Sequence, residues 1–284
     1  MGQASGSLCV FFPQWIRQPA RIPLRDVVIM IHVSQLKKTY SDLEQGEFVA
    51  LNGINFNAMP GQIYGLLGPN GAGKTTALRI LSTVLKPTSG TATINGYDVV
   101  QEPAKVRHQI GFVSTNTAIY DRMTAWEVIR FFGLLYGMPA EELQIRMEVI
   151  FERFQMNNIR HILGSAMSTG MKQKVSIARA IIHDPPVLIF DEATSGLDIL
   201  VSREVLKTIE RLKEQGKCIL FSSHIMSEVH RLCDQVAILN RGELLAEGTI
   251  HELSNRYRQS DLEELFFNLI ASHNEGREQV SALV

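Results

Sequence analysis

The residues best suited to chemistry form one short run, Gly68-Pro69-Asn70-Gly71-Ala72-Gly73-Lys74-Thr75-Thr76. The run has the pattern G-x-x-x-x-G-K-T and follows the apolar stretch 63–67, which predicts a strand directly before it. Glycines let the backbone turn tightly and aim N–H groups at phosphate oxygens, and the positive end of a helix beginning near Lys74 faces the same anion. We expect Lys74 to reach the β- and γ-phosphates and the Thr75 hydroxyl to bind magnesium.

Two adjacent carboxylates, Asp191 and Glu192, form the second group of reactive residues. They follow the apolar run 186–190, which predicts a buried strand ending at this pair. Asp191 can hold magnesium through water, while Glu192 can polarise the water that attacks the γ-phosphorus. A strand followed by Asp-Glu can by itself be a solvated turn. The phosphate-binding loop upstream favours the metal site.

Alternating strands and helices must position these residues. The alternation after residue 187 implies right-handed crossovers and a largely parallel sheet, which binds ligands at the carboxyl ends of its strands. Strands are expected at 30–38, 48–59, 63–67, 91–94, 110–113, 187–190, 218–221, 236–239 and after Gly242, with loops at 41–47 and 86–90 and a hairpin turn at Asn95-Gly96.

A stretch with helical periodicity interrupts the series of predicted strands. Apolar residues recur at helical spacing between 124 and 154, with Thr124 as an N-cap and Pro139 near the start of a second helix. We expect an inserted helical subdomain there. Further helices are expected at 171–182, 200–214, 225–232 and from Leu262 onward; the last packs on its own core or on a partner.

The first 29 residues differ from the rest of the chain. They contain Pro13, Pro19 and Pro23, scattered arginines and no sustained period, whereas a strand pattern begins at Met30. We interpret them as a disordered leader or a misassigned start, with an amphipathic surface anchor around Trp15 as the alternative. No window of the sequence is apolar for long enough to predict a membrane span.

Composition limits the function classes. The chain has 284 residues and a net charge of −1, which argues against nucleic-acid binding through a broad basic surface. Cys9, Cys218 and Cys233 lack C-x-x-C spacing, so neither a disulfide framework nor a zinc site is predicted, and a reducing cytosol fits best. Cys218 lies in an apolar run and is expected to be a small buried hydrophobe.

With these motifs together, residues 30–270 resemble the nucleotide-binding subunit of an ABC transporter. The family's signature sequence corresponds to Met167-Ser168-Thr169-Gly170-Met171, its D-loop to Ser195-Gly196-Leu197-Asp198 and its switch histidine to His224. Tyr40 matches the aromatic residue on which adenine stacks in the family, although a core tyrosine is the alternative. The local sequence is similar to the sodium-extrusion (NatA) and drug-export group.

The resemblance implies an α/β fold: a RecA-like P-loop NTPase core with a β-rich N-terminal layer and an inserted helical subdomain. It divides the chain into a leader (1–29), an ATPase domain (30–250, helical subdomain about 114–170) and a C-terminal helical tail (251–284). The ligands implied are ATP and Mg²⁺. Ser168 and Gly170 are then expected to act on the ATP held by a second subunit, Asp198 of the D-loop to take part in nucleotide binding, and His224 to bond the γ-phosphate.

The resemblance implies an exporter subunit on the cytoplasmic face of the cell membrane, where two such subunits hydrolyse ATP and a separate membrane permease carries the substrate. The alternative is an ABC ATPase that works on ribosomes or DNA; one P-loop and near-neutral charge disfavour it. The sequence departs from the family at Thr169 and Met171 in the signature and at Thr115-Asn116, where the family has a glutamine. The last departure leaves open which side chain there meets magnesium.

Overall fold

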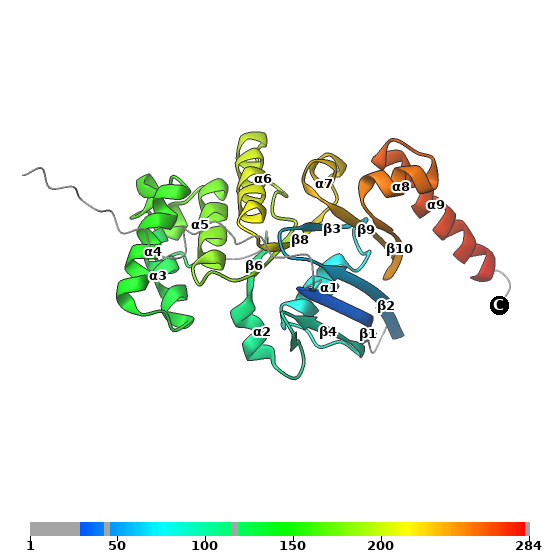
Figure 1. Cartoon of the computed structure of the whole chain (residues 1–284), viewed down its shortest axis with the longest axis horizontal. Helices are drawn as coiled ribbons and strands as arrows, with labels where there is room; N and C mark the ends of the chain where they lie inside the picture. Colours follow the sequence, from blue (N-terminus) through cyan, green and yellow to red (C-terminus); the bar gives the residue numbers. More distant parts are fainter. Residues whose placement is uncertain (1–28, 43–45, 115–118, 282–284) are drawn as a thin grey trace, which may run out of the picture.

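The structure, a computed structural model of the chain, describes residues 29–42, 46–114 and 119–281 (Figure 1). Its central strands are β3 (Ile63–Leu67), β6 (Ile110–Ser114), β7 (Val187–Asp191), β8 (Cys218–Ser223), β9 (Gln235–Asn240) and β10 (Glu243–Gly248). Within the described residues they form one six-stranded sheet, ordered β10-β9-β3-β8-β7-β6. All are parallel except β10, which pairs antiparallel with β9. The predicted α/β core with a largely parallel sheet is confirmed.

A second sheet forms the β-rich N-terminal layer. Its strands are β1 (Ile31–Asp42), β2 (Gly46–Ala58), β4 (Ser89–Ile94) and β5 (Tyr97–Asp98), in the order β2-β1-β4-β5. The prediction was wrong at two loops, since Ser41 and Asp42 continue β1 and Ser89 and Gly90 open β4. Antiparallel pairing with neighbouring strands stabilises these polar residues as strand, a long-range effect that local composition does not register.

One irregularity in β2 connects this layer to the phosphate-binding loop. Lys38 pairs with Leu51 and Thr39 with Val49, so Ala50 is an extra residue on β2, a β-bulge. A Cβ atom on Gly73 would lie 2.6 Å from the Ala50 carbonyl oxygen. Because Gly73 also has φ 107°, only glycine fits where the loop meets the bulge.

The inserted helices are α3 (Ala125–Leu135), α4 (Ala140–Arg153) and α5 (Thr169–Ile181). Thr124 caps α3 as predicted, and its hydroxyl and the Glu127 side chain form a reciprocal capping box. Pro139 caps the start of α4. Helix α5 begins two residues before the predicted Met171, because the Ser168 hydroxyl accepts a hydrogen bond from the Met171 N–H at 3.3 Å and so sets the first turn.

Further helices cover both faces of the central sheet (Figure 1). They are α1 (Lys74–Leu81), α2 (Pro103–Gln109), α6 (Ile199–Glu214), α7 (Met226–Leu232) and α8 (Ile250–Tyr257). Helix α2 was not predicted, because it buries Val106 alone and so has no apolar period. Helix α8 begins at the expected boundary between the ATPase domain and the helical tail.

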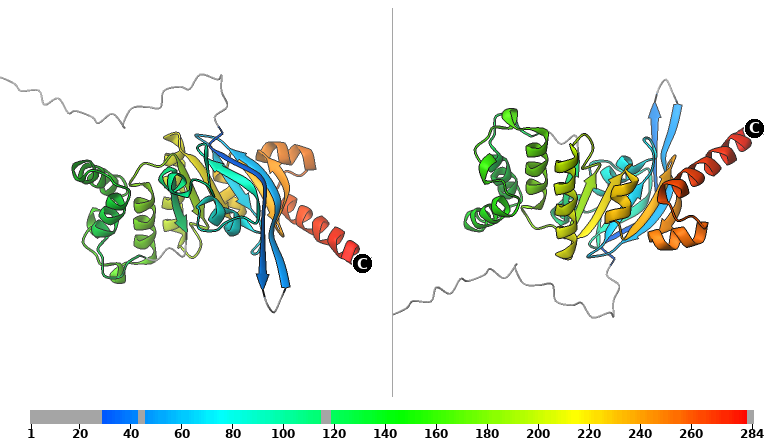
Figure 2. Two further views of the ribbon diagram at one scale, coloured as in Figure 1. Left: turned by 90° about the horizontal axis from the view of Figure 1, so that it is seen from below. Right: turned by 90° about the horizontal axis from the view of Figure 1, so that it is seen from above.

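The last helix, α9 (Leu262–Ser281), extends away from the body of the molecule (Figure 2). Its first turns do not: Leu262, Leu265 and Phe266 are at most 6% exposed and join the core on the face of the sheet that α6 and α7 cover. The expectation that this helix packs on its own core is confirmed. Phe267, by contrast, is 56% exposed.

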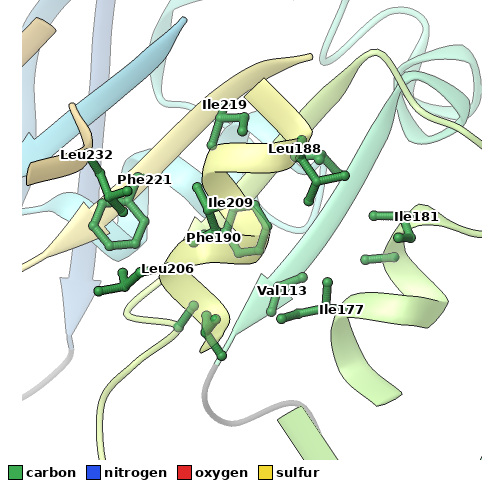
Figure 3. Close-up of a cluster of buried hydrophobic side chains, with 14 of the residues drawn as sticks. Val113, Ile177, Ile181, Leu188, Phe190, Leu206, Ile209, Ile219, Phe221 and Leu232 are labelled. Atoms are coloured by element: carbon green, nitrogen blue, oxygen red, sulfur yellow. The ribbon is translucent and has the colours of Figure 1, made fainter. Parts of the chain in front are cut away.

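Alternate residues of the central strands build two separate cores. In β7, Leu188 and Phe190 lie on one face with Ile209 of α6 (Figure 3), whereas Ile189 lies on the other with Leu78 of α1. A strand buried on both faces must be apolar throughout, which is the pattern that marked it in the sequence. Both cores hold the carboxyl ends of the strands rigidly in place.

Cys218 behaves as the sequence predicted. It is fully buried in β8, and burial raises the pKa of its thiol to about 12, so it stays protonated and unreactive at neutral pH.

In the part of the chain that the structure describes, no helix is both long and apolar enough to cross a membrane.

Candidate nucleotide-binding and hydrolysis site

The phosphate-binding loop joins β3 to α1, as the motif predicts. Lys74 is the first residue of α1, and its side chain bends back over the loop, where Nζ donates to the Gly68 carbonyl at 2.6 Å and the Pro69 carbonyl at 3.1 Å. Burial lowers the pKa of Lys74, although the carboxylates of Glu192 and Asp191 act in the opposite direction. The loop carbonyls that accept from this buried amine are neutral. A phosphate group would therefore be a charged acceptor in their place.

Close backbone packing holds the loop. A Cβ atom at Gly68 would lie 2.4 Å from the Leu239 carbonyl oxygen, so the loop rests directly on β9. The Gly242 N–H donates to the Ala72 carbonyl at 2.9 Å. Asn70 and Gly71 are exposed at the tip of the loop, and Thr75 and Thr76 follow Lys74 in the first turn of α1. Backbone contacts with Leu239 and Gly242 therefore fix the shape of the cradle.

Asp191 at the end of β7 faces the first turn of α1. The Thr75 hydroxyl donates to Asp191 Oδ1 at 3.3 Å, and the Ser222 hydroxyl of β8 donates to the same oxygen at 2.7 Å. Oxygen donors of this kind are the ligands that Mg²⁺ prefers. The donor set fits the predicted magnesium site, with Thr75 and Asp191 as the residues that would hold the ion.

Glu192 lies at the centre of the site with an unusual backbone. Its φ is +50°, in the left-handed region that costs a residue other than glycine about 1–2 kcal/mol. Its N–H is held by the Ser222 carbonyl at 3.2 Å and the Ser222 hydroxyl at 3.1 Å. This turn aims the carboxylate at the loop, where Oε1 lies 3.7 Å from Lys74 Nζ and 3.4 Å from His224 Nδ1.

His224 follows directly after β8 and comes to the same place from a different strand. Its side chain is 46% exposed, and its contact with Glu192 leaves the ring open to the space in front of the loop. The structure therefore brings Lys74, Asp191, Glu192 and His224, which belong to three motifs far apart in the sequence, together at the carboxyl edge of the sheet.

Glu228 of α7 is a buried charged residue that the sequence analysis missed. Only 7% exposed, it accepts hydrogen bonds at Oε2 from the Thr194 hydroxyl (2.8 Å) and the Ser223 hydroxyl (3.0 Å). Ser223 also accepts from the Ile225 N–H at 3.0 Å. This network fixes the backbone on both sides of His224 and connects it to the segment after Glu192.

Gln173 makes a second connection that the sequence did not reveal. From within α5 its Nε2 donates to the Ala193 carbonyl at 2.8 Å, in a buried position. The helix that follows the signature is therefore hydrogen-bonded to the residue after Glu192. A glutamine in the middle of a helix gives no sequence signal of such a contact.

The remaining predicted residues lie apart from the loop. Ser168 and Asp198 cap α5 and α6, and among the described residues neither they nor Gly170 form a hydrogen bond with the phosphate-binding loop of the same chain. Tyr40, near the end of β1, is 39% exposed, and Lys38 Nζ lies 5.1 Å from its ring centre. Thr115 and Asn116 fall outside the described residues, so their predicted role stays a prediction.

This geometry agrees with the comparisons to known proteins. A family model described as ABC transporter matches residues 51–195. The chain belongs to this family. The ABC transporter ATP-binding protein NatA of Bacillus subtilis is 40% identical over 84% of this chain and 97% of NatA. The linearmycin resistance ATP-binding protein LnrL, also of Bacillus subtilis, is 35% identical over 80% of this chain and 71% of LnrL.

Solved structures agree with this membership. The cassette MJ0796, a dimer in a post-hydrolysis state bound to ADP and Pi, superposes with a TM-score of 0.69 and 26% identity over 78% of this chain and 98% of that one. The predicted ATP-binding subunit of an ABC exporter, an ATPase of the dimeric class, is confirmed at the level of the family. The alternative function, an ABC ATPase that works on ribosomes or DNA, has no support among these relatives.

Proposed function

We propose that Glu192 is the general base of ATP hydrolysis in this ABC ATPase, with Asp191 and Thr75 as magnesium ligands. The observation that supports it most strongly is the placement of one carboxylate between Lys74 and His224. Among the described residues, Glu192 is the one carboxylate within 4 Å of both Lys74 Nζ and His224 Nδ1. Lys74 and the loop N–H groups bind the β- and γ-phosphates of ATP.

The chain's own residues then have separable tasks. Glu192 accepts the proton of the attacking water, while His224 holds the γ-phosphate and orients the carboxylate. Lys74 exchanges the Gly68 carbonyl for phosphate oxygens, which also compensates its burial. When bound, Mg²⁺ would supply positive charge to the phosphates through Thr75 and Asp191. Ser222 orients Asp191 and holds the strained backbone of Glu192.

The site is completed by a second subunit. Ser168 and Gly170 open α5 with exposed or half-exposed backbone, an anion site that faces no phosphate of its own chain. The dimeric form of the MJ0796 cassette supports the placement of this signature, and of Asp198, on the ATP of a partner subunit. Tyr40 is proposed to stack on the adenine.

A separate integral membrane permease is the proposed second partner, which places the ATPase on the cytoplasmic face of the membrane. Relatives that are named for export or drug resistance support export as the direction of transport. Exposed apolar side chains on and before α3 offer a surface to such a partner; they are Tyr120, Phe131, Leu134 and Leu135. Closure of the dimer on ATP would then change the shape that the permease meets.

The deciding experiment compares Glu192→Gln with Asp191→Asn. Glu192→Gln should bind Mg·ATP as the wild type does but hydrolyse it about 10²–10⁴-fold more slowly, because an amide cannot accept the proton of the water. With ATP it should accumulate as a dimer, detected by light scattering.

Asp191→Asn is the contrasting variant, since it should shift the magnesium concentration needed for activity. Near-normal turnover of Glu192→Gln would overturn the assignment of the base. The roles would be reversed if Asp191→Asn trapped the dimer while its magnesium dependence stayed unchanged.

A further inference from the structure

A hollow of about 360 Å³ lies beside the phosphate-binding loop. One wall is Pro69 of the loop and another is formed by Ile225 and Met226, directly after the switch histidine. The third wall is α9, through Phe266 and the exposed Phe267, whose rings meet edge to face at 5.7 Å. Gly68, His224, Ser227 and Glu263 also line the hollow, so its apolar walls stand beside polar groups of the proposed phosphate site.

An apolar pair projects from a different part of the same sheet edge. Ile199 and Leu200 open α6 and are 87% and 74% exposed, among the most exposed large apolar side chains of the described residues. They follow Asp198, whose carboxylate accepts from the Leu200 N–H at 3.0 Å and fixes the direction of the turn. Two adjacent apolar side chains held rigidly in water indicate an interaction surface.

The pair lies beside the signature. Helix α6 and the start of α5 touch where a Cβ atom at Gly170 would come within 2.9 Å of Val201 Cγ2. The hollow, by contrast, lies beside the loop that binds phosphate. If the signature of one subunit meets the loop of another, the neighbours of the signature must face the neighbours of the loop.

We infer that Ile199 and Leu200 of a second copy of this chain fill the hollow formed by Met226 and Phe267 when the dimer closes. This inference rests on the proposed dimer and specifies a contact that it does not require. The first turns of α9 would thereby become part of the interface. Burial of apolar surface on both sides would favour the closed state in addition to the shared nucleotide.

Charged substitutions test the contact in a Glu192→Gln background, in which ATP should hold the dimer closed. Leu200→Asp and Phe267→Lys should each raise the dimer dissociation constant at least tenfold, because each puts a charge into an apolar contact. Neither should change the affinity of the monomer for ATP. The double variant should dimerise better than either single one, since opposite charges then meet.

Val84→Asp is the matched control. Val84 is 71% exposed and lies beyond the far end of α1 from the loop, so this substitution should leave dimerisation unchanged. If Leu200→Asp and Phe267→Lys dimerise as well as Val84→Asp, the inference is wrong. If no ATP-dependent dimer forms even with Glu192→Gln alone, the proposed function fails first.

Cross-linking tests the same contact without relying on affinity. A chain carrying Leu200→Cys and Phe267→Cys should form a covalent dimer under oxidation with ATP and not without it, because a disulfide needs Cα atoms within about 7 Å. These chains also carry Cys9→Ser, and the native Cys218 and Cys233 are buried and should not react. Equal cross-linking by a Val84→Cys and Phe267→Cys chain, or none in the ATP-bound dimer, would contradict the contact.

Discussion

Single residues of the site depend on neighbours far away in the sequence. Ser222 is the clearest case, since one hydroxyl donates to Asp191 and accepts from the Glu192 N–H. It therefore holds both the proposed magnesium ligand and the proposed base. Glu192 keeps a left-handed backbone only because such contacts over-determine it.

We predict that Ser222→Ala lowers both activity and stability. Loss of two hydrogen bonds at a buried position should reduce the free energy of unfolding by about 1–3 kcal/mol. The turnover should fall more than ATP binding, because the base and the magnesium ligand lose their orientation while the phosphate loop is untouched. Urea unfolding and ATPase assays at saturating ATP measure the two effects. Wild-type turnover in a destabilised variant would restrict Ser222 to a structural role.

The motifs could be predicted because each carries its chemistry locally. The glycines around Lys74 indicate a turn and a helix start within a few residues. The Asp191-Glu192 pair indicates the end of a strand. Ser222, Glu228 and Gln173 could not be predicted, since their partners lie 31, 34 and 20 residues away and depend on how the strands pair.

Helices and strands also divide into those that local sequence predicts and those that depend on distant packing. The start of α3 was predictable because Thr124 and Glu127 form a local capping box. Helix α2 has no such cap bond and little apolar contact, so packing rather than sequence period determines it. The polar ends of β1 and β4 were missed for the same reason.

The capping box at the start of α3 should contribute to the stability of the protein. Thr124→Ala should destabilise the protein by about 1 kcal/mol, because the Glu127 N–H at the helix start loses the Thr124 hydroxyl as its acceptor. ATP binding should be unaffected, since α3 lies away from the phosphate loop. Thermal unfolding with and without nucleotide tests this. An unchanged midpoint would mean that the packing of α3, and not its cap, determines its stability.

His183, after α5, predicts a pH dependence of stability. Its ring stacks on Tyr136 with 3.5 Å between centroids, and burial lowers its pKa to about 4, below the ordinary value of about 6.5. The unfolded chain therefore binds the proton more readily. The neutral ring stabilises the fold fully above about pH 6.5, and this contribution is lost as the pH falls towards 4.

We expect the free energy of unfolding to fall by about 1–3 kcal/mol more between pH 7 and 4.5 in the wild type than in His183→Phe. The phenylalanine keeps a flat ring against Tyr136 but has no proton to bind. Urea unfolding at several pH values measures the difference. Parallel pH profiles for the two proteins would show that His183 does not contribute.

At the scale of the whole molecule, the proposed dimer gives each chain one half of each of two sites. Lys74 belongs to one half, and Ser168 lies outside it with no hydrogen bond to the loop among the described residues. This arrangement predicts complementation. Lys74→Ala should be inactive because the phosphate cradle loses its cation, and Ser168→Arg should bind ATP but not hydrolyse it.

A mixture of these two inactive variants should recover ATPase activity. In a mixed dimer the intact loop of the Ser168→Arg subunit meets the intact signature of the Lys74→Ala subunit. Activity should appear on mixing and rise with protein concentration. Continued inactivity of the mixture, or full turnover by isolated wild-type monomers, would contradict a site shared between subunits.

The bulge at Ala50 affects which nucleotides the protein is expected to prefer. The carbonyl of this one extra residue abuts Gly73 of the phosphate cradle, while β1 beside it carries the proposed base-stacking Tyr40. In the proposed binding mode, the β1–β2 pair therefore contacts the base through Tyr40 and the phosphate-binding loop through Ala50, and the bulge fixes the distance between these two contacts. Deleting Ala50 would make Lys38–Leu51 and Thr39–Val49 consecutive pairs, which removes the bulge and withdraws its carbonyl from Gly73. A chain so shortened should keep its affinity for pyrophosphate and lose its preference for adenine nucleotides.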